Sequence, residues 1–258
     1  MIRLIHGDCL VEMDKLIAEG VKVNAIITDP PYGVTSCKWD SVIPFDEMWL
    51  RLNKLIKDNG VIALFGNEPF ASYLRISNIK NYRYDWIWNK VKPSNFQLMN
   101  YQCGKIHELI LIFSKGKSCY TSNNNTMIYY PQKTFRKNIR ISNIKNENYI
   151  NNTMLRGTFK VKDTYKIYND KHPISIITYS NADNKNKIHP TQKPVELLEY
   201  LIKTYTLKGE TVLDFTAGSG STGIACRNLD RNFIGIELDE HYFNIMKNRV
   251  ENHKRKLF

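Results

Sequence analysis

The segment Asp29-Pro30-Pro31-Tyr32 joins a carboxylate to an aromatic ring through a stiff turn. Proline fixes φ at about −65° and removes a backbone N–H donor, so two in succession restrict the chain strongly. The Asp29 carboxylate and the Tyr32 ring are then held in a fixed relation, which suits the binding of a flat ring with hydrogen-bonding edges, such as a nucleobase. The preceding run 25–28 is typical of a buried strand, so we expect the motif at the carboxyl end of a strand.

A second segment, 214–222, begins with a carboxylate and is rich in glycine: Asp-Phe-Thr-Ala-Gly-Ser-Gly-Ser-Thr. It leads from a predicted strand into a predicted helix, where glycines let the backbone turn sharply and approach a ligand. Glu237 ends the next predicted strand, nineteen positions after Gly218, where an acidic side chain can hydrogen-bond ribose hydroxyls. The pair indicates a nucleoside site of the Rossmann type, without the third glycine of dinucleotide-binding proteins. The alternative is an ordinary tight turn followed by a surface glutamate.

Two groups of lysines stand near these segments. Lys193 belongs to the hexapeptide His-Pro-Thr-Gln-Lys-Pro at 189–194, directly before a predicted helix. Taken alone, it is typical of a surface lysine at the start of a helix. Lys90 and Lys92 follow a predicted strand at 82–88, and they are interpreted either as contacts to a phosphate backbone or as solvated loop lysines.

Together, these segments resemble the motifs of one known family. Segment 29–32 resembles the catalytic motif of the DNA amino-methyltransferases, which methylate an exocyclic amine of a base. Segments 214–222 and 233–239 resemble the S-adenosylmethionine loop of methyltransferases, and 189–194 matches another motif of the family. Their order is similar to that of the β group of N6-adenine enzymes, with the catalytic motif first and the cofactor loop last. Protein- and ribosomal-RNA-modifying enzymes with Asn-Pro-Pro-Tyr normally have the opposite order.

The resemblance implies a sequence-specific enzyme that transfers a methyl group from S-adenosylmethionine to the N6 amine of an adenine flipped out of double-stranded DNA. In the family, an aspartate such as Asp29 and the carbonyl of Pro30 accept the amine hydrogens, and Tyr32 stacks on the base. The resemblance also implies that Lys193 neutralises the methionine carboxylate of the cofactor and that Thr191 hydrogen-bonds it.

The site residues that the resemblance implies form two groups. The catalytic residues are Asp29, Pro30, Pro31 and Tyr32. The cofactor-binding residues are Asp8, His189, Thr191, Lys193, Asp214, Thr216, Ala217, Gly218, Ser219, Gly220, Ser221, Thr222, Glu237 and Leu238. Asp8 enters this group because Gly-Asp at 7–8 resembles the short motif that touches the cofactor's adenine. The family's usual Asp-Pro-Phe reads Asp-Phe-Thr at 214–216, so position 216 lacks the usual aromatic side chain.

Two alternative functions stay open. N4-cytosine methylation uses the same chemistry, but its enzymes more often carry serine in place of Asp29. A non-catalytic DNA-binding homologue, acting as one subunit of a heterodimer, is expected to have lost Asp29 or the glycine turn, and both are present. C5-cytosine methylation is disfavoured because none of the five cysteines follows a proline.

The charge of the chain indicates a nucleic-acid partner. The 258 residues carry a net charge of +12, which favours a polyanion over a membrane surface. Residues 115–187 hold fourteen Lys or Arg and four Asp or Glu, so the excess of positive charge is concentrated in this segment. A local binding surface explains this concentration better than biased codon usage does. The partners expected are double-stranded DNA and, since the DNA-reading module is short, a second copy in a homodimer. The resemblance also implies a place in a restriction–modification system.

The cysteines and the apolar stretches bear on cofactors and location. The five cysteines show no metal-ligand spacing, so we expect no metal. Reduced cysteines are typical of a cytosolic protein, and no apolar stretch reaches the length of a membrane span. We therefore expect a cytoplasmic protein.

The elements that must position these residues alternate along the chain. Apolar periodicity predicts strands at 2–5, 22–28, 61–65, 82–88, 108–113, 211–215 and 233–237, and helices at 10–19, 45–57, 69–76, 194–206, 221–229 and 239–254. Such alternation predicts an α/β fold with a mostly parallel sheet. Two late strands without a helix between them predict one antiparallel edge strand. The resemblance identifies the fold as Rossmann-like, with a circularly permuted motif order.

Three parts follow from this order of elements. Residues 1–114 are predicted to form the catalytic half of the methyltransferase domain, and 189–258 its cofactor-binding half. Residues 115–188 lack apolar periodicity and are rich in Asn, Lys and Tyr. We interpret them as an inserted target-recognition module with irregular segments, in preference to a disordered linker.

Overall fold

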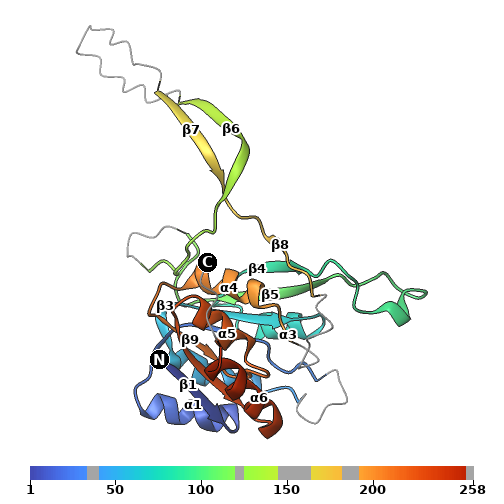
Figure 1. Ribbon diagram of the computed structural model, residues 1–258, viewed down its shortest axis with the longest axis vertical. Coiled ribbons are helices and arrows are strands. Elements are labelled where there is room, and N and C mark those ends of the chain that lie inside the picture. Colours follow the sequence, from blue (N-terminus) through green and yellow to red (C-terminus); the bar gives the residue numbers. More distant parts are fainter. Residues whose placement is uncertain (34–40, 120–124, 145–163, 182–191, 254–258) are drawn as a thin grey trace. The chain divides into compact units, whose positions relative to one another are not determined.

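The computed structural model describes residues 1–33, 41–119, 125–144, 164–181 and 192–253 (Figure 1). The chain divides into two compact units. The first comprises Met1–Tyr130 and Ile174–Phe258, and the second spans Pro131–Pro173. The first unit contains the regular α/β architecture and is described first.

Strands and helices of the first unit alternate in the predicted order. Its described strands are β1 (Ile2–His6), β2 (Val23–Thr28), β3 (Ile56–Gly66), β4 (Tyr82–Asn89), β5 (His107–Phe113), β8 (Ile176–Thr178), β9 (Thr211–Asp214) and β10 (Asn232–Glu237). Its described helices are α1 (Cys9–Ala18), α2 (Phe45–Leu55), α3 (Phe70–Ser77), α4 (Val195–Tyr205), α5 (Ser221–Asn228) and α6 (Glu240–Glu251), with a short 3-10 turn, η1 (Phe96–Leu98). Most boundaries agree with the predicted ones to within one or two residues, but β3 begins earlier, where Ile56 pairs with Val23.

The strands of the first unit form one sheet in the order β1-β10-β9-β2-β3-β5-β4-β8. Among the described residues, β5 runs antiparallel to β3 and β4, and the other pairings of the sheet are parallel. The predicted α/β class with a mostly parallel sheet is confirmed. The reversed strand lies inside the sheet rather than at its edge, because β5 pairs with β3 on one side and with β4 on the other.

Segments from the two ends of the sequence interleave in this sheet. β2 lies between β3 and β9, and β10 lies between β9 and β1. The carboxyl ends of β1, β2, β9 and β10 therefore meet at one edge, because parallel strands share their direction. The two segments that were predicted to carry catalysis and cofactor binding follow β2 and β9 at that edge.

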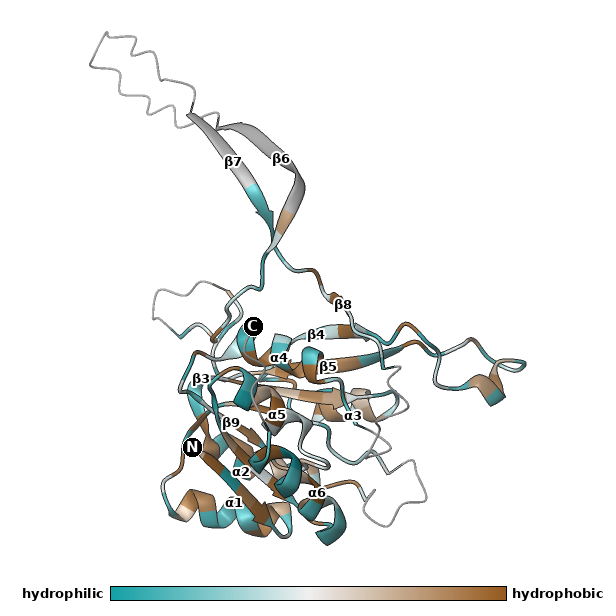
Figure 2. Cartoon of the chain, viewed as in Figure 1, coloured by the Kyte–Doolittle hydropathy of each residue, from teal (hydrophilic) through white to brown (hydrophobic). Residues whose placement is uncertain are grey.

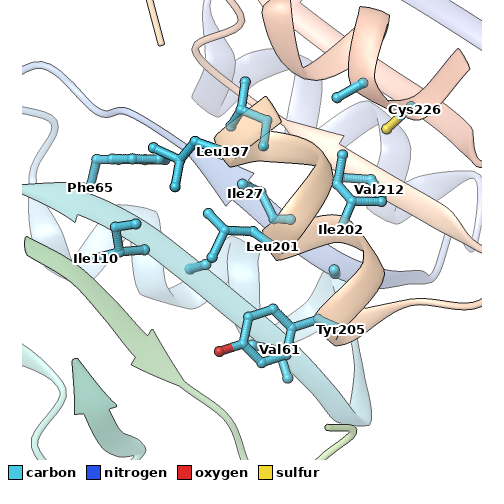
Figure 3. Close-up of a cluster of buried hydrophobic side chains, with 14 of the residues drawn as sticks. Ile27, Val61, Phe65, Ile110, Leu197, Leu201, Ile202, Tyr205, Val212 and Cys226 are labelled. Atoms are coloured by element: carbon cyan, nitrogen blue, oxygen red, sulfur yellow. The ribbon is translucent and has the colours of Figure 1, made fainter. Parts of the chain in front are cut away.

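Apolar side chains pack on both faces of the sheet, because successive strand residues point to opposite sides. In β2, Ala25 and Ile27 belong to a buried cluster with α4, α5 and α6, whereas Ile26 belongs to a cluster with α1, α2 and α3. Figure 3 shows Leu197 and Leu201 of α4 directed toward the sheet face that carries Ile27. Figure 2 shows the outcome in hydropathy: the strands are mostly hydrophobic, and the helices carry both kinds of residue.

Two aspartates that follow strands begin the helices behind them. The Asp8 carboxylate accepts the N–H groups of Leu10 and Val11, at 2.9 and 3.1 Å. The Asp239 carboxylate accepts the N–H of Tyr242 at 3.0 Å. Caps of this kind stabilise a helix by about 1 kcal/mol each. They fix the corners after β1 and β10 at the same sheet edge.

Residues on both sides of the second unit belong to the first. Met127 is buried in the core, and the N–H groups of Ile128 and Tyr130 donate to Asn59 and Thr204 at 2.9 and 2.8 Å. After the second unit, β8 joins the main sheet and buries Ile177. The functional boundaries at 115 and 188 stay a prediction.

The second unit contains an antiparallel pair, β6 (Thr134–Ile144) and β7 (Thr164–Lys171). Lys133 and Asp170 form an ion pair at 2.7 Å, at the end of the two strands where Thr134 lies opposite Lys171. Two strands alone are marginally stable in water. Residues 145–163, which were assigned to the recognition module, lie outside the described residues.

Neither a membrane-spanning helix nor a metal-binding cluster occurs in the described part of the chain. No helix there is long and apolar enough to cross a membrane. No group of three or more His, Cys, Asp or Glu side chains there could hold a metal ion. The described cysteines, Cys9, Cys103, Cys119 and Cys226, are free thiols.

Candidate active site

The sheet edge described above opens into a cavity of about 330 Å³. The predicted site residues that line it are Asp8, Asp29, Pro30, Pro31, Tyr32, Lys193, Asp214, Thr216, Ala217, Gly218, Ser219, Ser221, Thr222, Glu237 and Leu238. The fold therefore brings the carboxylate–aromatic turn and the glycine-rich loop into one site. Of the remaining predicted residues, Gly220 lies beside the cavity, and His189 and Thr191 fall outside the described residues.

The Asp29 carboxylate is held by two side chains. Its Oδ1 accepts the hydroxyl of Tyr32, and its Oδ2 accepts the ammonium of Lys193. The carboxyl group is largely buried, with 19% of the side chain exposed. Burial raises the pKa of Asp29, and the adjacent ammonium of Lys193 opposes that shift. The ion pair thus fixes the orientation of the carboxylate and favours its ionised form.

A chain of alternating charges continues behind Asp29. Lys193 Nζ lies 3.6 Å from Glu108 Oε2, and Glu108 Oε1 lies 3.1 Å from Lys90 Nζ. The side chains of Lys90 and Glu108 are 4% and 12% exposed. Burial raises the pKa of Glu108, but the two ammonium groups outweigh burial and the net shift is downward. For Lys193, burial lowers the pKa, and Asp29 and Glu108 together raise it above its ordinary value.

Both earlier interpretations of Lys90 are therefore wrong. It is neither a solvated loop lysine nor a contact to a phosphate backbone, because it is buried against Glu108. Lys193 is likewise not a surface lysine, since 10% of its side chain is exposed. Its predicted contact to a cofactor carboxylate stays a prediction.

Thr216 joins the glycine-rich loop to the carboxylate–aromatic turn. Its hydroxyl donates to the backbone carbonyl of Asp29 at 3.0 Å and lies 2.6 Å from the hydroxyl of Thr28. The residue that replaces the family's usual aromatic side chain thus makes a polar link between the two segments. Such a link fixes the distance between the catalytic turn and the loop.

Asp214 lies at the base of the cavity and organises the loop. Its carboxylate accepts hydrogen bonds from the hydroxyls of Thr28 and Thr222, both at 2.6 Å, and from the Thr216 N–H at 3.3 Å. Burial raises the pKa of Asp214 to about 6, and the hydrogen bonds from the two hydroxyls oppose that shift. The contacts of Asp214 are therefore internal, and they shape the loop from below.

Glu237 shapes the loop from the opposite side. Its two carboxylate oxygens accept the N–H groups of Gly218 and Asp239, at 2.7 and 2.9 Å. Burial raises the pKa of Glu237, and these N–H donors oppose the shift. Because the side chain also lines the cavity, its predicted contact to ribose hydroxyls is sterically compatible with its position.

Gly220 sets the entry into α5 without lining the cavity. Its φ is +80°, and a Cβ there would lie 2.8 Å from Cγ of Met246. A larger residue would meet both backbone strain and the packed side chain of α6. The preceding residue, Ser219, is held by Arg249, whose Nη1 donates to the serine carbonyl at 2.5 Å and to its hydroxyl at 2.8 Å.

The cavity suits a polar nucleoside that carries positive charge. The carboxylates of Asp29, Asp214 and Glu237 all line it. The hydroxyl of Ser221 is buried and has no hydrogen-bond partner among the described residues, so a ligand can supply one. At the other end, the Tyr32 ring packs against Phe70 with centroids 4.9 Å apart, which supports it as a stacking surface.

Sequence reasoning missed Glu108 and the burial of Lys90. One signal was available: Glu108 begins the otherwise apolar run 108–113. A charge in such a strand must be paired once it is buried. The identity of its partners depends on the hairpin between β4 and β5 and on α4, which the sequence pattern does not specify.

Comparisons with known proteins agree with this geometry. Residues 23–248 match the family model N6_N4_Mtase, described as DNA methylase. The chain is 28% identical over 264 residues to Type II methyltransferase M.HpaI of Haemophilus parainfluenzae, which covers 96% of this chain and 74% of that relative. It is also 28% identical over 267 residues to Type II methyltransferase M1.MboII of Moraxella bovis, with 94% of each chain covered.

Solved structures give the same result. The crystal structure of the M1.HpyAVI–SAM complex superposes with a TM-score of 0.64 at 27% identity, over 97% of this chain and 99% of that one. The PvuII DNA methyltransferase, which is cytosine-N4-specific, has a TM-score of 0.60 at 14% identity over 100% of this chain and 90% of that one. The second likeness is one of fold alone.

Proposed function

This chain belongs to the DNA methylase family, and from that premise we propose that it transfers a methyl group from S-adenosylmethionine to the N6 amine of adenine in double-stranded DNA. The observation that carries the proposal is the meeting of two segments in one cavity. The turn at 29–32 lies against the loop at 214–222, and the Thr216 hydroxyl bonds the Asp29 carbonyl at 3.0 Å. A base-binding turn and a nucleoside-binding loop are thereby held side by side.

When bound, S-adenosylmethionine supplies an electrophilic methyl group. We assign its nucleoside to the glycine-rich loop, to the Glu237 carboxylate and to the Ser221 hydroxyl, which has no partner in the part of the chain that the structure describes. The carboxylates that line the cavity suit a sulfonium ion, which carries positive charge. Two related structures, of M1.HpyAVI and of TTHA0409 from Thermus thermophilus, are described as complexes with this cofactor.

Asp29 prepares the amine of the target base for reaction. The lone pair of that nitrogen is delocalised into the ring, which makes it a poor nucleophile. Hydrogen bonds from the amine to the Asp29 carboxylate and to the Pro30 carbonyl favour a pyramidal nitrogen and localise the pair. When this nitrogen bonds the methyl carbon, the bond from that carbon to the sulfonium sulfur would break, and its electron pair would stay on the sulfur of the product S-adenosylhomocysteine. The Asp29 carboxylate would accept the proton that the nitrogen loses. Positioning and electrostatics carry this catalysis.

Lys193 serves both halves of the site in this proposal. Its ammonium has three N–H donors, of which one is directed to Asp29 and one toward Glu108. The third can meet the methionine carboxylate of the cofactor, because Lys193 lines the cavity. One side chain then contacts both the cofactor and the catalytic carboxylate.

DNA as the substrate is supported by the charge of the chain as well as by its family. The net charge of +12 favours a polyanion. The proposal places sequence recognition in the insert 115–188 and the protein in the cytoplasm, where host DNA lies. Analytical ultracentrifugation of the purified protein tests the predicted homodimer by measuring its mass in solution.

The proposal is tested by identifying the product. Purified protein is incubated with methyl-labelled S-adenosylmethionine and DNA of mixed sequence, and the DNA is digested to nucleosides and separated. We expect the label in N6-methyladenine. Label in N4-methylcytosine would show that the target base is cytosine and not adenine. Absence of label from the DNA would overturn the proposal that the protein is a DNA methyltransferase.

Asp29→Ala separates catalysis from cofactor binding in the same assay. We expect the variant to lose transfer to DNA while the affinity for S-adenosylmethionine, measured by calorimetry, changes little. A large loss of cofactor affinity would contradict the role proposed for Asp29.

A further inference from the structure

The segment between β4 and β5, residues 90–106, extends beyond the sheet as a folded arm (Figure 1). We call it the β4–β5 arm. Its stem is closed by the N–H of Lys90 donating to the carbonyl of Ile106 at 2.7 Å and by the N–H of Ser94 donating to the carbonyl of Lys105 at 3.1 Å. Near the tip, the Asn95 side chain bridges the strands by accepting the Lys105 N–H at 2.6 Å. The arm is therefore ordered before it meets a partner, which lowers the entropy cost of binding.

The tip of the arm exposes large apolar side chains. Tyr101 is 87% exposed and Phe96 66%, and Leu98 and Met99 between them are also exposed. Figure 2 shows hydrophobic residues at the turn that ends the arm. Scattered exposed apolar residues are ordinary, but four within six positions on an ordered projection indicate a contact surface.

The composition of the arm selects a nucleic acid as the partner. Apart from Lys90, which is buried at its base, the arm contains Lys92 and Lys105 and no Asp or Glu. Its exposed amides, Gln97, Asn100 and Gln102, are of the type that hydrogen-bonds base edges. A two-fold contact with a second copy would bring the same lysine-bearing surface against itself, so charge favours a polyanion over a dimer partner.

The base of the arm is joined to the catalytic carboxylate. Lys90, the first residue of the arm, pairs with Glu108, which faces Lys193, which in turn pairs with Asp29. The next residue, Val91, has a φ of +71°, a conformation that is strained for a β-branched side chain. The arm thus leaves the sheet at a strained joint directly behind the group proposed to bind the target base.

We propose that the β4–β5 arm is a wedge that contacts duplex DNA beside the target base and stacks Phe96 or Tyr101 into the space that this base leaves. The inference rests on the proposed function, because it requires a base that turns out of the duplex. Stacking of an aromatic ring on a neighbouring base recovers interaction energy of the same order as that lost on unstacking. Proteins that kink or open DNA insert apolar side chains in this way.

The test uses the double variant Phe96→Ala/Tyr101→Ala of the full chain. Its substrate is a duplex that carries the recognition sequence of the wild type, mapped by sequencing DNA that the wild type has methylated. The duplex is either fully paired or has the target base opposite an abasic site. We expect kcat/KM on the paired duplex to fall roughly 10- to 100-fold, the range that lost base–aromatic stacking predicts. The deficit is expected to shrink on the abasic duplex, where extrusion of the base costs less.

Tyr73→Ala is the matched control, because Tyr73 is 64% exposed on α3 and lies outside the arm. Tyr73→Ala should leave kcat/KM unchanged on both duplexes. Tyr73→Ala and the double variant should both keep the cofactor affinity and the melting temperature of the wild type. Fluorescence of 2-aminopurine at the target position should rise on binding of the wild type and remain low with the double variant.

Several results would overturn the wedge. The first is an unchanged kcat/KM in the double variant, and the second is an equal loss of kcat/KM on both duplexes. The third is a wild type that is dimeric and a double variant that is monomeric, because the arm would then be an interface between two copies. Failure of the wild type to methylate any DNA would instead overturn the proposed function, and the wedge with it.

Discussion

Glu108 lies between two buried ammonium groups, and its removal should cost more than the loss of an ordinary ion pair. Glu108→Gln leaves Lys90 and Lys193 without the charge between them. A buried charge that loses its partner typically destabilises a protein by about 3–5 kcal/mol. We expect a loss of about that size in the free energy of unfolding, measured by urea denaturation.

Two variants make this expectation specific. In Lys90→Met/Glu108→Gln, one of the two ammonium groups is also removed, so stability should partly recover. Glu19→Gln is the exposed control, since its pair with Arg3 has side chains 46% and 39% exposed, and it should destabilise the protein much less than Glu108→Gln does. A double variant less stable than Glu108→Gln would contradict the role assigned to Glu108 as the charge that pairs with Lys90.

Asp214 should give the unfolding free energy a distinct pH dependence. Its pKa is about 6 in the folded protein, raised by burial from 3.8. Between these values the native state binds the extra proton, so its contribution to stability is fully present below pH 3.8 and is lost as pH rises through about 6. The size is about 3 kcal/mol for a shift of this order.

Asp214→Asn removes that titration while conserving shape. We expect the difference in unfolding free energy, wild type minus variant, to fall between pH 4 and pH 7 in urea titrations. A difference that stays flat over this interval would show that Asp214 does not titrate there.

The turn into α5 depends on a glycine for two separable reasons, and a pair of substitutions distinguishes them. Gly220 has a φ of +80° and close neighbours in Met246 and Val250, whereas Gly209 has a φ of +78° and open space around it. Gly209→Ala should therefore report backbone strain alone, about 1 kcal/mol. Gly220→Ala adds overpacking of typically 1–3 kcal/mol, and equal losses in urea unfolding would contradict the packing contribution.

Most elements were predictable because their signals are local. Apolar periodicity predicted α1 and β2 close to their observed bounds. The joining of the two site segments was predictable from the resemblance and from the rule that parallel strands share an edge. Local patterns did not predict β8, because three residues carry too little periodicity, and its place was decided by pairing with β4.

The contacts that tune the site were not predictable in the same way. Lys90 and Glu108 meet across the β4–β5 hairpin, and Lys193 joins them from the approach to α4. Thr216 reaches Asp29 from a segment far along the chain. Such pairs depend on tertiary geometry, and each residue type alone is equally compatible with a solvated surface.

For the whole molecule, the second unit should be separable from the cofactor site. Both of its flanks are fixed in the first unit: the Tyr130 N–H donates to Thr204, and the Ser175 carbonyl accepts the Ile87 N–H at 2.8 Å. Residues 131–173 hold ten Lys or Arg and three Asp or Glu, so their replacement by a neutral Gly-Ser linker lowers the net charge from +12 to +5.

The linker variant should keep its affinity for S-adenosylmethionine and bind DNA more weakly. Because fewer phosphates are neutralised, the plot of log K against log salt concentration should become shallower. Calorimetry measures the first quantity and fluorescence anisotropy over a salt series the second. An unchanged salt slope would show that the second unit does not contact the DNA backbone, and lost cofactor affinity would show that it supports the cavity.

The interleaved sheet also constrains when the protein acquires activity during its own synthesis. β1 and β2 pair with β10 and β9, so residues 2–28 find these neighbours only in residues 211–237. Pairings between such distant segments form slowly and late. A chain emerging from the ribosome carries Asp29 beside an open sheet edge until residues 211–237 have been translated. Nascent and prematurely terminated chains therefore have no cofactor cavity, and catalytic competence appears only after β10 has been made.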